Sequence, residues 1–325
     1  MEKPDLSTSA GRYEMMLIIR LFEQKIEKLF EEGKIHGTAH LCIGQEACAV
    51  GAVAAARPDD PIVSSHRGHG HFIARSADPG ALMAEMLGKV TGPCKGRGGS
   101  QHLCARDLAF YGTNGITGGG IPTATGLALS QKLDGSEHVV LCFFGDGAAN
   151  QGTFHESLNM ASIWQLPVVY ICENNLYAMS TSVSDSMSVE KIARRAQSYD
   201  IPGVTLDGMD PEAVMDGVAE ALQRARSDEG PTLVEAKTYR FCGHSKSDRL
   251  VYRTDEEEQC WQAVDPITVE RKALIAGGLA EDRLDEIEER CRTRIDDAYQ
   301  TAQQADFPGP DDVLVSPYCN EGEAS

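Results

Sequence analysis

The sequence predicts an α/β fold in which an open, mostly parallel sheet carries helices on both faces and is followed by a C-terminal helical extension. Two strand patterns of continuous apolar residues flank a helical pattern between residues 138 and 174. Strand and helix patterns then alternate as far as residue 240, which is typical of parallel βαβ units. A charged helical pattern closes the chain, so we predict an α/β domain over residues 1–275 and a helical extension and tail over residues 276–325.

Length and composition describe an ordinary globular enzyme. The 325 residues can bury one large or two modest domains. A hydrophobic content of 42% with 24% charged residues is usual for such chains. The formal net charge of −19 argues against nucleic acid or an anionic membrane as a partner.

The N-terminus and the cysteines predict a cytoplasmic protein. Residues 1–12 lack the apolar core of a signal peptide, and no apolar run approaches a membrane-spanning length. Ten cysteines are scattered without any C-x-x-C pair, which favours buried thiols over a disulfide framework or a zinc site.

The first part of the chain predicts one helix followed by glycine-rich loops. An amphipathic helix is indicated by apolar residues that step by three and four, namely Met15, Ile18, Phe22, Ile26 and Leu29. Residues 92–102 and 112–126 are dense in glycine, which indicates turns or backbone held close to a ligand.

The middle of the chain contains the clearest βαβ unit. The elements predicted there, in order, are a strand over His138–Phe144, a helix over Gly152–Trp164, a strand over Pro167–Asn174, a strand over Gly203–Gly208, a helix over Glu212–Arg226 and a strand over Pro231–Arg240. The central strands are continuously apolar rather than alternating, which indicates that both of their faces are covered.

One apolar stripe runs along the charged C-terminal helix: Leu284, Ile287, Cys291, Ile295, Ala298 and Ala302. This stripe could pack on the helix's own domain or on another subunit, and we favour its own domain.

Polar residues follow the two strands of the βαβ unit. Asp146 comes after the first strand, and Asn175 lies 29 residues later, after the second. Parallel neighbouring strands end at the same edge of a sheet, where open α/β folds bind their ligands. A carboxylate and an amide oxygen suit Mg²⁺, which often takes further oxygens from a phosphate. The pair therefore predicts a metal-bridged diphosphate site.

Two other interpretations of these residues remain. The turn from Gly145 resembles a dinucleotide-binding G-x-G-x-x-G loop, and Glu173 stands where a ribose-binding acid would belong. However, Asp146 would repel a bare pyrophosphate, and Asn150 replaces the third glycine. The residues could also be plain turns, since Gly, Asp and Asn dominate turns; their placement after consecutive buried strands makes this the weaker interpretation.

The wider sequence resembles a known family. "GDG" followed by about thirty residues and "NN" is similar to the thiamine diphosphate (TPP) binding motif. The text "GDGAANQGTFHESLNMASIWQLPVVYICENNLYAMST" resembles the α subunit of the decarboxylating component of 2-oxo acid dehydrogenase complexes, and most of all that of acetoin dehydrogenase. Further matching segments occur in order along the chain: "HLCIGQEA", "HRGHGH", "CKGRGGSQH", "NGITGGGIP" and "YRFCGHSKSD".

The resemblance implies a role for individual residues. Asp146, the Asn175 side chain and the Tyr177 carbonyl would hold Mg²⁺ on the diphosphate, with backbone donors from Gly147 and Ala148.

Further positions match other parts of the family's site. Arg67 would contact the diphosphate, as would His66, which stands where many relatives carry tyrosine. Gly115 and Thr117 align with positions that contact the aminopyrimidine ring. His40 and His244 match the family's active-site histidines, and His244 also belongs to the cofactor-binding set.

The sequence leaves the roles of other residues near these motifs undecided. His69, His71 and His102 could line the site or make local hydrogen bonds. Ser245 occupies the place of a phosphorylation site in mitochondrial relatives, but its loop lacks their Pro-Gly, so no phosphorylation is predicted here.

The resemblance also implies an activity and partners. The enzyme would cleave acetoin or decarboxylate pyruvate, leave a two-carbon unit on TPP, and transfer it oxidatively to the lipoyl group of an acyltransferase component. A separate β subunit would supply the glutamate that activates the cofactor, in a heterotetramer of two α and two β subunits. The alternatives are a branched-chain 2-oxo acid dehydrogenase α subunit, an NAD-dependent Rossmann dehydrogenase, and a TPP-binding subunit without catalytic activity.

Overall fold

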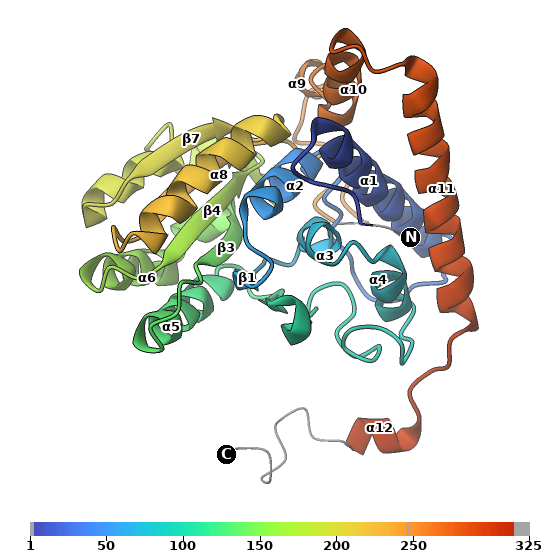
Figure 1. The fold of residues 1–325 in the computed structure, drawn as a ribbon, viewed down its shortest axis with the longest axis horizontal. Coiled ribbons are helices and arrows are strands. Elements are labelled where there is room, and N and C mark those ends of the chain that lie inside the picture. Colours follow the sequence, from blue (N-terminus) through green and yellow to red (C-terminus); the bar gives the residue numbers. More distant parts are fainter. Residues whose placement is uncertain (1–2, 246, 315–325) are drawn as a thin grey trace.

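The computed structural model describes residues 3–245 and 247–314, and it contains a six-stranded sheet surrounded by helices (Figure 1). Every strand pairing in this sheet is parallel, which confirms the predicted fold class. Its strands are β1 (Ile62–Val63), β2 (Phe110–Gly112), β3 (Val140–Gly145), β4 (Val168–Asn174), β7 (Gly203–Asp207) and β8 (Thr232–Lys237). A separate antiparallel hairpin is formed by β5 (Tyr177–Ala178) and β6 (Thr181–Ser182).

The strand order creates a crevice between β1 and β3. The order across the sheet is β2-β1-β3-β4-β8-β7. From β1 the chain moves outward to β2, whereas from β3 it moves in the opposite direction to β4. Connections that diverge in this way leave a gap at the carboxyl ends of the two strands, which is where open α/β sheets bind ligands.

Helices lie on both faces of the sheet (Figure 1). The α-helices are α1 (Ser9–Glu31), α2 (Glu46–Ala55), α3 (His69–Ser76), α4 (Pro79–Met86), α5 (Gly120–Leu133), α6 (Gly152–Ile163), α7 (Val183–Ser186), α8 (Pro211–Arg226), α9 (Asp255–Gln262), α10 (Pro266–Ala276), α11 (Glu281–Gln304) and α12 (Pro310–Leu314). The described residues also include the 3₁₀ segments η1 (Arg106–Leu108), η2 (Asp146–Asn150) and η3 (Ile192–Tyr199).

The sheet separates two hydrophobic cores. Leu141, Phe143 and Ile171 pack with α1, α2, α8 and α11 on one face. Cys142 and Tyr170 belong to the other core, with α5, α6 and η3. Neighbouring residues of one strand therefore enter opposite cores, because successive side chains in a strand point to opposite faces. This arrangement confirms that continuous apolar strands are covered on both sides.

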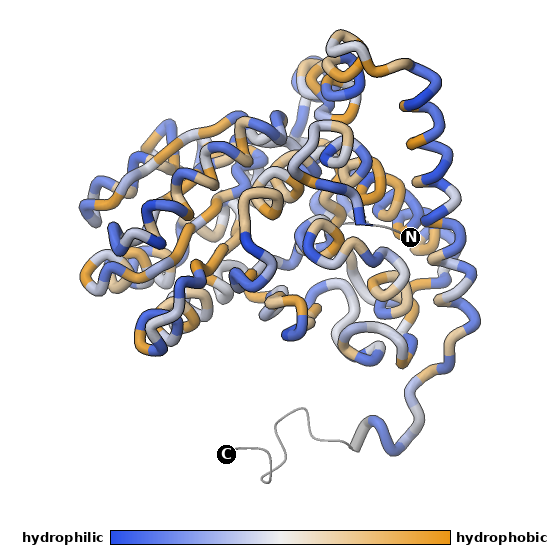
Figure 2. The backbone as a smooth tube through the Cα atoms, viewed as in Figure 1, coloured by the Kyte–Doolittle hydropathy of each residue, from blue (hydrophilic) through white to orange (hydrophobic). Residues whose placement is uncertain are grey.

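Helix α11 runs along α1 and α4 at the edge of the molecule (Figure 1). Its predicted apolar stripe is buried throughout, and the helix is otherwise largely hydrophilic (Figure 2). Tyr13 donates a hydrogen bond to Glu288 at 2.8 Å, and Arg290 pairs with Glu14 at 2.8 Å. The helix thus packs on its own chain, as favoured from the sequence. The predicted division at residue 275 lies beside the end of α10 and stays a prediction.

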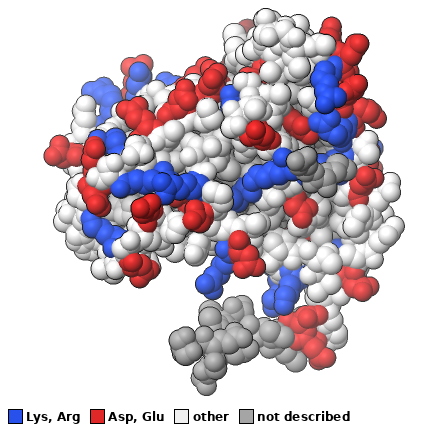
Figure 3. Space-filling view, viewed as in Figure 1, with Lys and Arg blue, Asp and Glu red and all other residues white. Residues whose placement is uncertain are grey.

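The surface charges are mixed, and the cysteines of the described residues are not paired in disulfides. Basic and acidic side chains are interspersed on the face shown in Figure 3. Within residues 3–245 and 247–314, no helix combines the length and apolarity needed to cross a membrane. The nine cysteines in the described part of the chain are free thiols, while Cys319 lies outside it.

Candidate active site

A cavity of about 360 Å³ opens at the carboxyl ends of β1, β3 and β4, where the strand order leaves its crevice. It is lined by every site residue predicted from the sequence: His40, His66, Arg67, Gly115, Thr117, Asp146, Gly147, Ala148, Asn175, Tyr177 and His244. Residues far apart in the chain therefore meet at one place, because parallel strands end at the same edge of the sheet.

Asp146 is the first residue after β3 and is 3% exposed. Burial raises its pKa to about 6, although the backbone N–H groups of Asp146 and Gly147 and the guanidinium groups of Arg240 and Arg67 act in the opposite direction. Both guanidinium groups act through their charge, and among the described residues no side chain donates a hydrogen bond to this carboxylate. Its burial without such a donor is the situation that a bound cation would relieve.

Asn175 follows β4 and is held by a side chain from another segment. Its Nδ2 donates to Gln45 Oε1 at 3.1 Å, which fixes the orientation of the amide. The Tyr177 backbone N–H donates to Asn175 Oδ1 at 3.4 Å. Both Asn175 and Asp146 are buried and line the same cavity.

A close backbone contact places Tyr177 beside the Asp146 turn. A Cβ atom at Gly147 would lie only 2.7 Å from Cβ of Ala178, so glycine is what allows η2 to pack against the β5 hairpin. The phenol of Tyr177 points elsewhere, since its hydroxyl donates to Glu257 at 2.7 Å. Only the backbone of Tyr177 is thus available as an oxygen donor.

These three residues fit Mg²⁺ by the chemistry of their donors. A carboxylate, an amide oxygen and a backbone carbonyl are hard oxygen ligands, and Mg²⁺ completes its shell with water or phosphate oxygens. A diphosphate bound here would lie close to the N-terminus of α6, because the N-cap residue Gln151 lines the cavity and its side chain makes no capping hydrogen bond.

Arg67 joins two loops of the site. Its guanidinium donates to the carbonyl of Leu41, next to His40, and to the carbonyl of His244 at 3.3 Å. The side chain is 5% exposed and lines the cavity. One buried cation therefore sets the relative position of the loops that carry His40 and His244.

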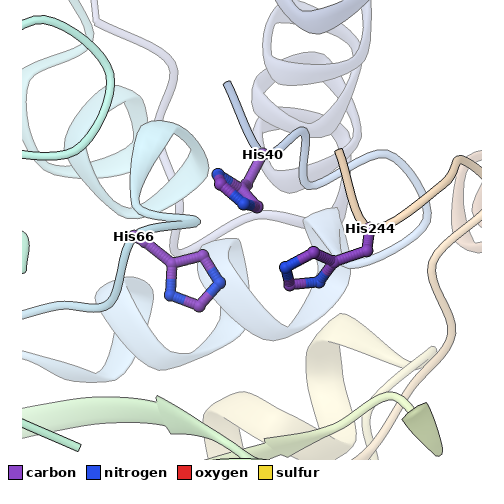
Figure 4. A group of neighbouring side chains, drawn as sticks. All are labelled: His40, His66 and His244. Atoms are coloured by element: carbon purple, nitrogen blue, oxygen red, sulfur yellow. The ribbon is translucent and has the colours of Figure 1, made fainter. Parts of the chain in front are cut away.

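Three imidazole rings converge at the cavity wall (Figure 4). The ring centroids of His40 lie 4.7 Å from His66 and 4.8 Å from His244. One ring nitrogen from each residue lies within 4.8 Å of the others. The backbone N–H of His244 donates to Asp248 at 2.7 Å, and Asp248 also accepts from the Tyr252 hydroxyl, so the third histidine is fixed by its own loop.

The three rings are neutral at pH 7. Burial, and then the charge of Arg67, lowers the pKa of His40 and His66 to about 3 and that of His244 to about 4. The same guanidinium disfavours a metal cation at this cluster. Each neutral imidazole offers one N–H donor and one acceptor, which suits hydrogen bonds to the oxygens of a small carbonyl compound.

Glu85 organises the glycine-rich loop beside the cavity. This carboxylate, 1% exposed, accepts backbone N–H bonds from Cys94, Gly96, Gly98 and Gly99 at 2.7–3.1 Å. The loop therefore closes around a side chain from α4, and Gln101, which follows it, lines the cavity.

The histidines left open by the sequence make local contacts. His69 lies between Glu23 and Ser100, each at 2.9 Å. His71 Nδ1 lies 2.9 Å from the Ser64 hydroxyl, and its Nε2 lies 3.4 Å from Glu173. Neither lines the cavity, and neither does His102, which is exposed.

Three residues of the site were not predicted. Gln45 holds Asn175, Gln101 Nε2 donates to His40 Nδ1 at 2.9 Å, and the fully buried Arg240 acts on the charges of the cavity. The two glutamines stand inside quoted motifs, but no local pattern marks a glutamine as a tertiary partner. An arginine at the end of the strand predicted over Pro231–Arg240 was the one available signal.

Comparison with known proteins agrees with the family resemblance seen in the sequence motifs. The family model described as "Dehydrogenase E1 component" matches residues 13–311. The chain is 44% identical over 307 residues to the α subunit of acetoin:2,6-dichlorophenolindophenol oxidoreductase of Bacillus subtilis, covering 94% of this chain and 92% of that protein.

Pyruvate dehydrogenase E1 α subunits are also similar. Identity is 39% over 317 residues to that of Rickettsia bellii, with 97% of each chain covered. It is 43% over 301 residues to that of Rhizobium meliloti, covering 92% of this chain and 86% of that protein. With a family match over nearly its whole length and relatives of this similarity, the chain belongs to the dehydrogenase E1 component family.

Proposed function

We propose that this chain is the α subunit of a TPP-dependent dehydrogenase that acts on acetoin or pyruvate and passes a two-carbon unit to a lipoyl group. The observation that carries the proposal is the buried Asp146 beside Asn175 at the switch in strand order. This arrangement suits a magnesium-bridged diphosphate and is poorly suited to a bare dinucleotide. Family membership also speaks against the NAD-dependent alternative.

Each residue has a distinct task in this proposal. Asp146, Asn175 and the Tyr177 carbonyl would hold Mg²⁺, while Arg67 would neutralise the diphosphate. TPP, when bound, supplies the carbanion-stabilising chemistry that the side chains lack. His40 and His244 would donate hydrogen bonds to the substrate oxygen, since both rings are neutral at pH 7.

Partners and location follow from the family. We propose that a β subunit completes the site in a heterotetramer of two α and two β subunits, and that a lipoyl-bearing acyltransferase accepts the product. Two large apolar side chains at the cavity, Ile116 and Met179, are exposed in this chain, which supports a partner subunit at this place. Free thiols in the described residues suit the cytoplasm, which we propose as the location.

Calorimetric titration with TPP tests the cofactor site. The full chain should bind TPP with Mg²⁺ and lose most of that affinity when the metal is omitted. Asp146→Ala should abolish the magnesium-dependent binding, whereas Asp216→Ala, an exposed carboxylate on α8, should leave it intact. Unchanged TPP affinity in Asp146→Ala would contradict the proposal.

Turnover tests the activity and the substrate. The chain should be inactive alone and, after co-purification with a β subunit, reduce an artificial electron acceptor. Acetoin, pyruvate and branched 2-oxo acids should be compared directly, because relatives named for acetoin and for pyruvate are both similar to this chain. Binding of TPP without turnover with any β subunit would favour the non-catalytic alternative.

A further inference from the structure

We propose that Gln101 fixes the tautomer of His40, so that His40 presents its Nε2–H to the cavity, and that a closed ring of contacts from Glu23 holds Gln101 in place. Gln101 is then a positioning residue, acting on substrate only through His40. The inference deepens the proposed function and rests on it for its catalytic consequence. The protonation of His40 itself can be measured without cofactor or substrate.

The first step is the contact between the two side chains. Gln101 Nε2 lies 2.9 Å from His40 Nδ1. An amide nitrogen can only donate, so Nδ1 of the neutral ring must accept and the single ring proton must sit on Nε2. His40 faces His66 and His244 within the cavity wall (Figure 4). The arrangement makes Nε2–H the free donor of His40.

The second step is what holds Gln101. Glu23, fully buried on α1, accepts from the Cys42 backbone N–H at 2.9 Å, two residues after His40. Its other oxygen lies 2.9 Å from His69 Nδ1, and His69 Nε2 lies 2.9 Å from the Ser100 hydroxyl. Ser100 directly precedes Gln101. The path from Glu23 through Cys42 to His40, and back through Gln101, Ser100 and His69, is therefore closed.

The third step is the burial of the residues that anchor the ring. The side chains of Glu23 and His69 are both inaccessible to solvent. Although burial opposes it, contact with His69 lowers the pKa of Glu23, so its carboxylate stays ionised. Glu85 fixes the preceding residues of the loop through four backbone N–H groups. The residues directly before Gln101 are thus tied to two buried carboxylates, Glu85 directly and Glu23 through His69.

Charges around His40 keep its ring neutral. Burial lowers its pKa to about 3, and the charged or titratable groups that face it act in the same direction: Arg67, His244, His69 and Arg240. A neutral ring with its proton fixed on Nε2 donates a hydrogen bond to developing negative charge, and its basic nitrogen is already used by Gln101. His40 therefore acts as a donor rather than as a general base.

Nitrogen NMR of the full chain, labelled with ¹⁵N-histidine, tests the tautomer directly. His40 should show the Nε2–H form, assigned by its loss in His40→Gln. In Gln101→Glu the new carboxylate accepts instead of donating, so the proton should move to Nδ1 and the pKa of His40 should rise. Gln101→Leu, which can do neither, should leave a mixture of tautomers. Glu23→Gln should weaken the preference without reversing it.

A matched variant separates the contact from a general charge effect. Gln151→Glu adds the same carboxylate to the same cavity but not at His40, so it should leave the tautomer of His40 unchanged. An Nδ1–H form in the unmodified chain would overturn the inference. So would a tautomer that is the same in Gln101→Glu and Gln101→Leu as in the unmodified chain.

The assembled α–β enzyme gives the catalytic readout. In Gln101→Glu, kcat should fall on the order of 10²-fold, the usual effect of losing one preorganised donor, and its pH profile should gain an ionisation that the unmodified enzyme lacks. An unchanged profile would overturn the donor role. If the NMR results hold but TPP does not bind, the proposed function fails and the tautomer assignment stands.

Discussion

The buried, ionised carboxylate of Asp146 lowers the stability of the folded chain, and a bound cation would remove this effect. Its carboxylate is buried at the end of β3, and burial raises its pKa from 3.8 to about 6. At neutral pH the residue is therefore ionised where ionisation is unfavourable. Bound Mg²⁺ would reverse this balance, because a divalent cation favours the charged form. The residue thus suits metal binding better than it suits the stability of the chain alone.

Replacing this carboxylate by an amide should stabilise the chain without ligands. Between pH 3.8 and about 6 the folded state binds more protons than the unfolded state, so stability falls as pH rises through this window. Asp146→Asn should raise the free energy of unfolding by up to about 3 kcal/mol at pH 8, and by less at pH 5.

Urea unfolding at the two pH values measures the effect, with Asp216→Asn on the exposed face of α8 as control. A stability gain of equal size at both pH values would show that the charge of Asp146 is not its source.

Among single residues, the sequence predicted those that belong to a recognisable local motif. Asp146 and Asn175 follow from two buried strands that end at one edge of a sheet. Gln101 and Glu23 could not be found in this way. Their partners, His40 and His69, lie 61 and 46 residues away, and a long-range hydrogen bond leaves no periodic or compositional trace.

At the scale of single elements, prediction depended on length. The continuous apolar runs of β3 and β4 were recognised within a few residues of their ends, because five buried positions in β3 and seven in β4 give a clear pattern. Strand β1 has two residues and β2 three, too few to show any period. Yet β1 positions Arg67 and the start of the site, so the least recognisable strand is among the most important.

A substitution in helix α11 tests how much its packing on α1 and α4 contributes to stability. Ile295 is 3% exposed within the stripe that packs on α1 and α4. Ile295→Ala removes buried methyl groups from a packed interface and should cost 2–5 kcal/mol by analogy with similar core truncations, about 3 kcal/mol being expected.

Glu289→Ala, on the exposed side of the same helix, should change stability by less than about 0.5 kcal/mol. Thermal and urea unfolding of both variants gives the comparison. Equal effects of the two substitutions would mean that the stripe contributes no packing energy.

At the scale of the whole molecule, the fold places its rigid and its accessible parts in different regions. All seven residues of β4 are buried between β3 and β8, whereas β7 is an edge strand with exposed residues. The cavity is lined mainly by loops that follow the strands. Such loops open more readily than a central strand, because fewer buried contacts hold them.

Hydrogen exchange followed by mass spectrometry should show this gradient. Backbone amides of residues 168–174 should exchange slowest among the strands and those of residues 203–207 fastest. Adding TPP with Mg²⁺ should slow exchange at residues 112–118 and 145–150, next to the cavity, and leave residues 203–207 unchanged. Protection spread evenly over the chain, or confined to β7, would contradict a ligand held at the switch between β1 and β3.

The Glu85 contact has a consequence for how the glycine-rich loop tolerates change. Because its shape depends on four backbone N–H groups that reach one carboxylate, the loop places little demand on the side chain of Arg97. In a saturation library, sequence constraint should therefore concentrate on Glu85, which lies on the preceding helix α4. It should also concentrate on glycines such as Gly96 and Gly98, where a Cβ atom would lie 2.4 Å from another backbone atom. Positions that tolerate substitution would then alternate with positions that do not within this loop. The residue on which the loop depends most, Glu85, would lie outside the loop.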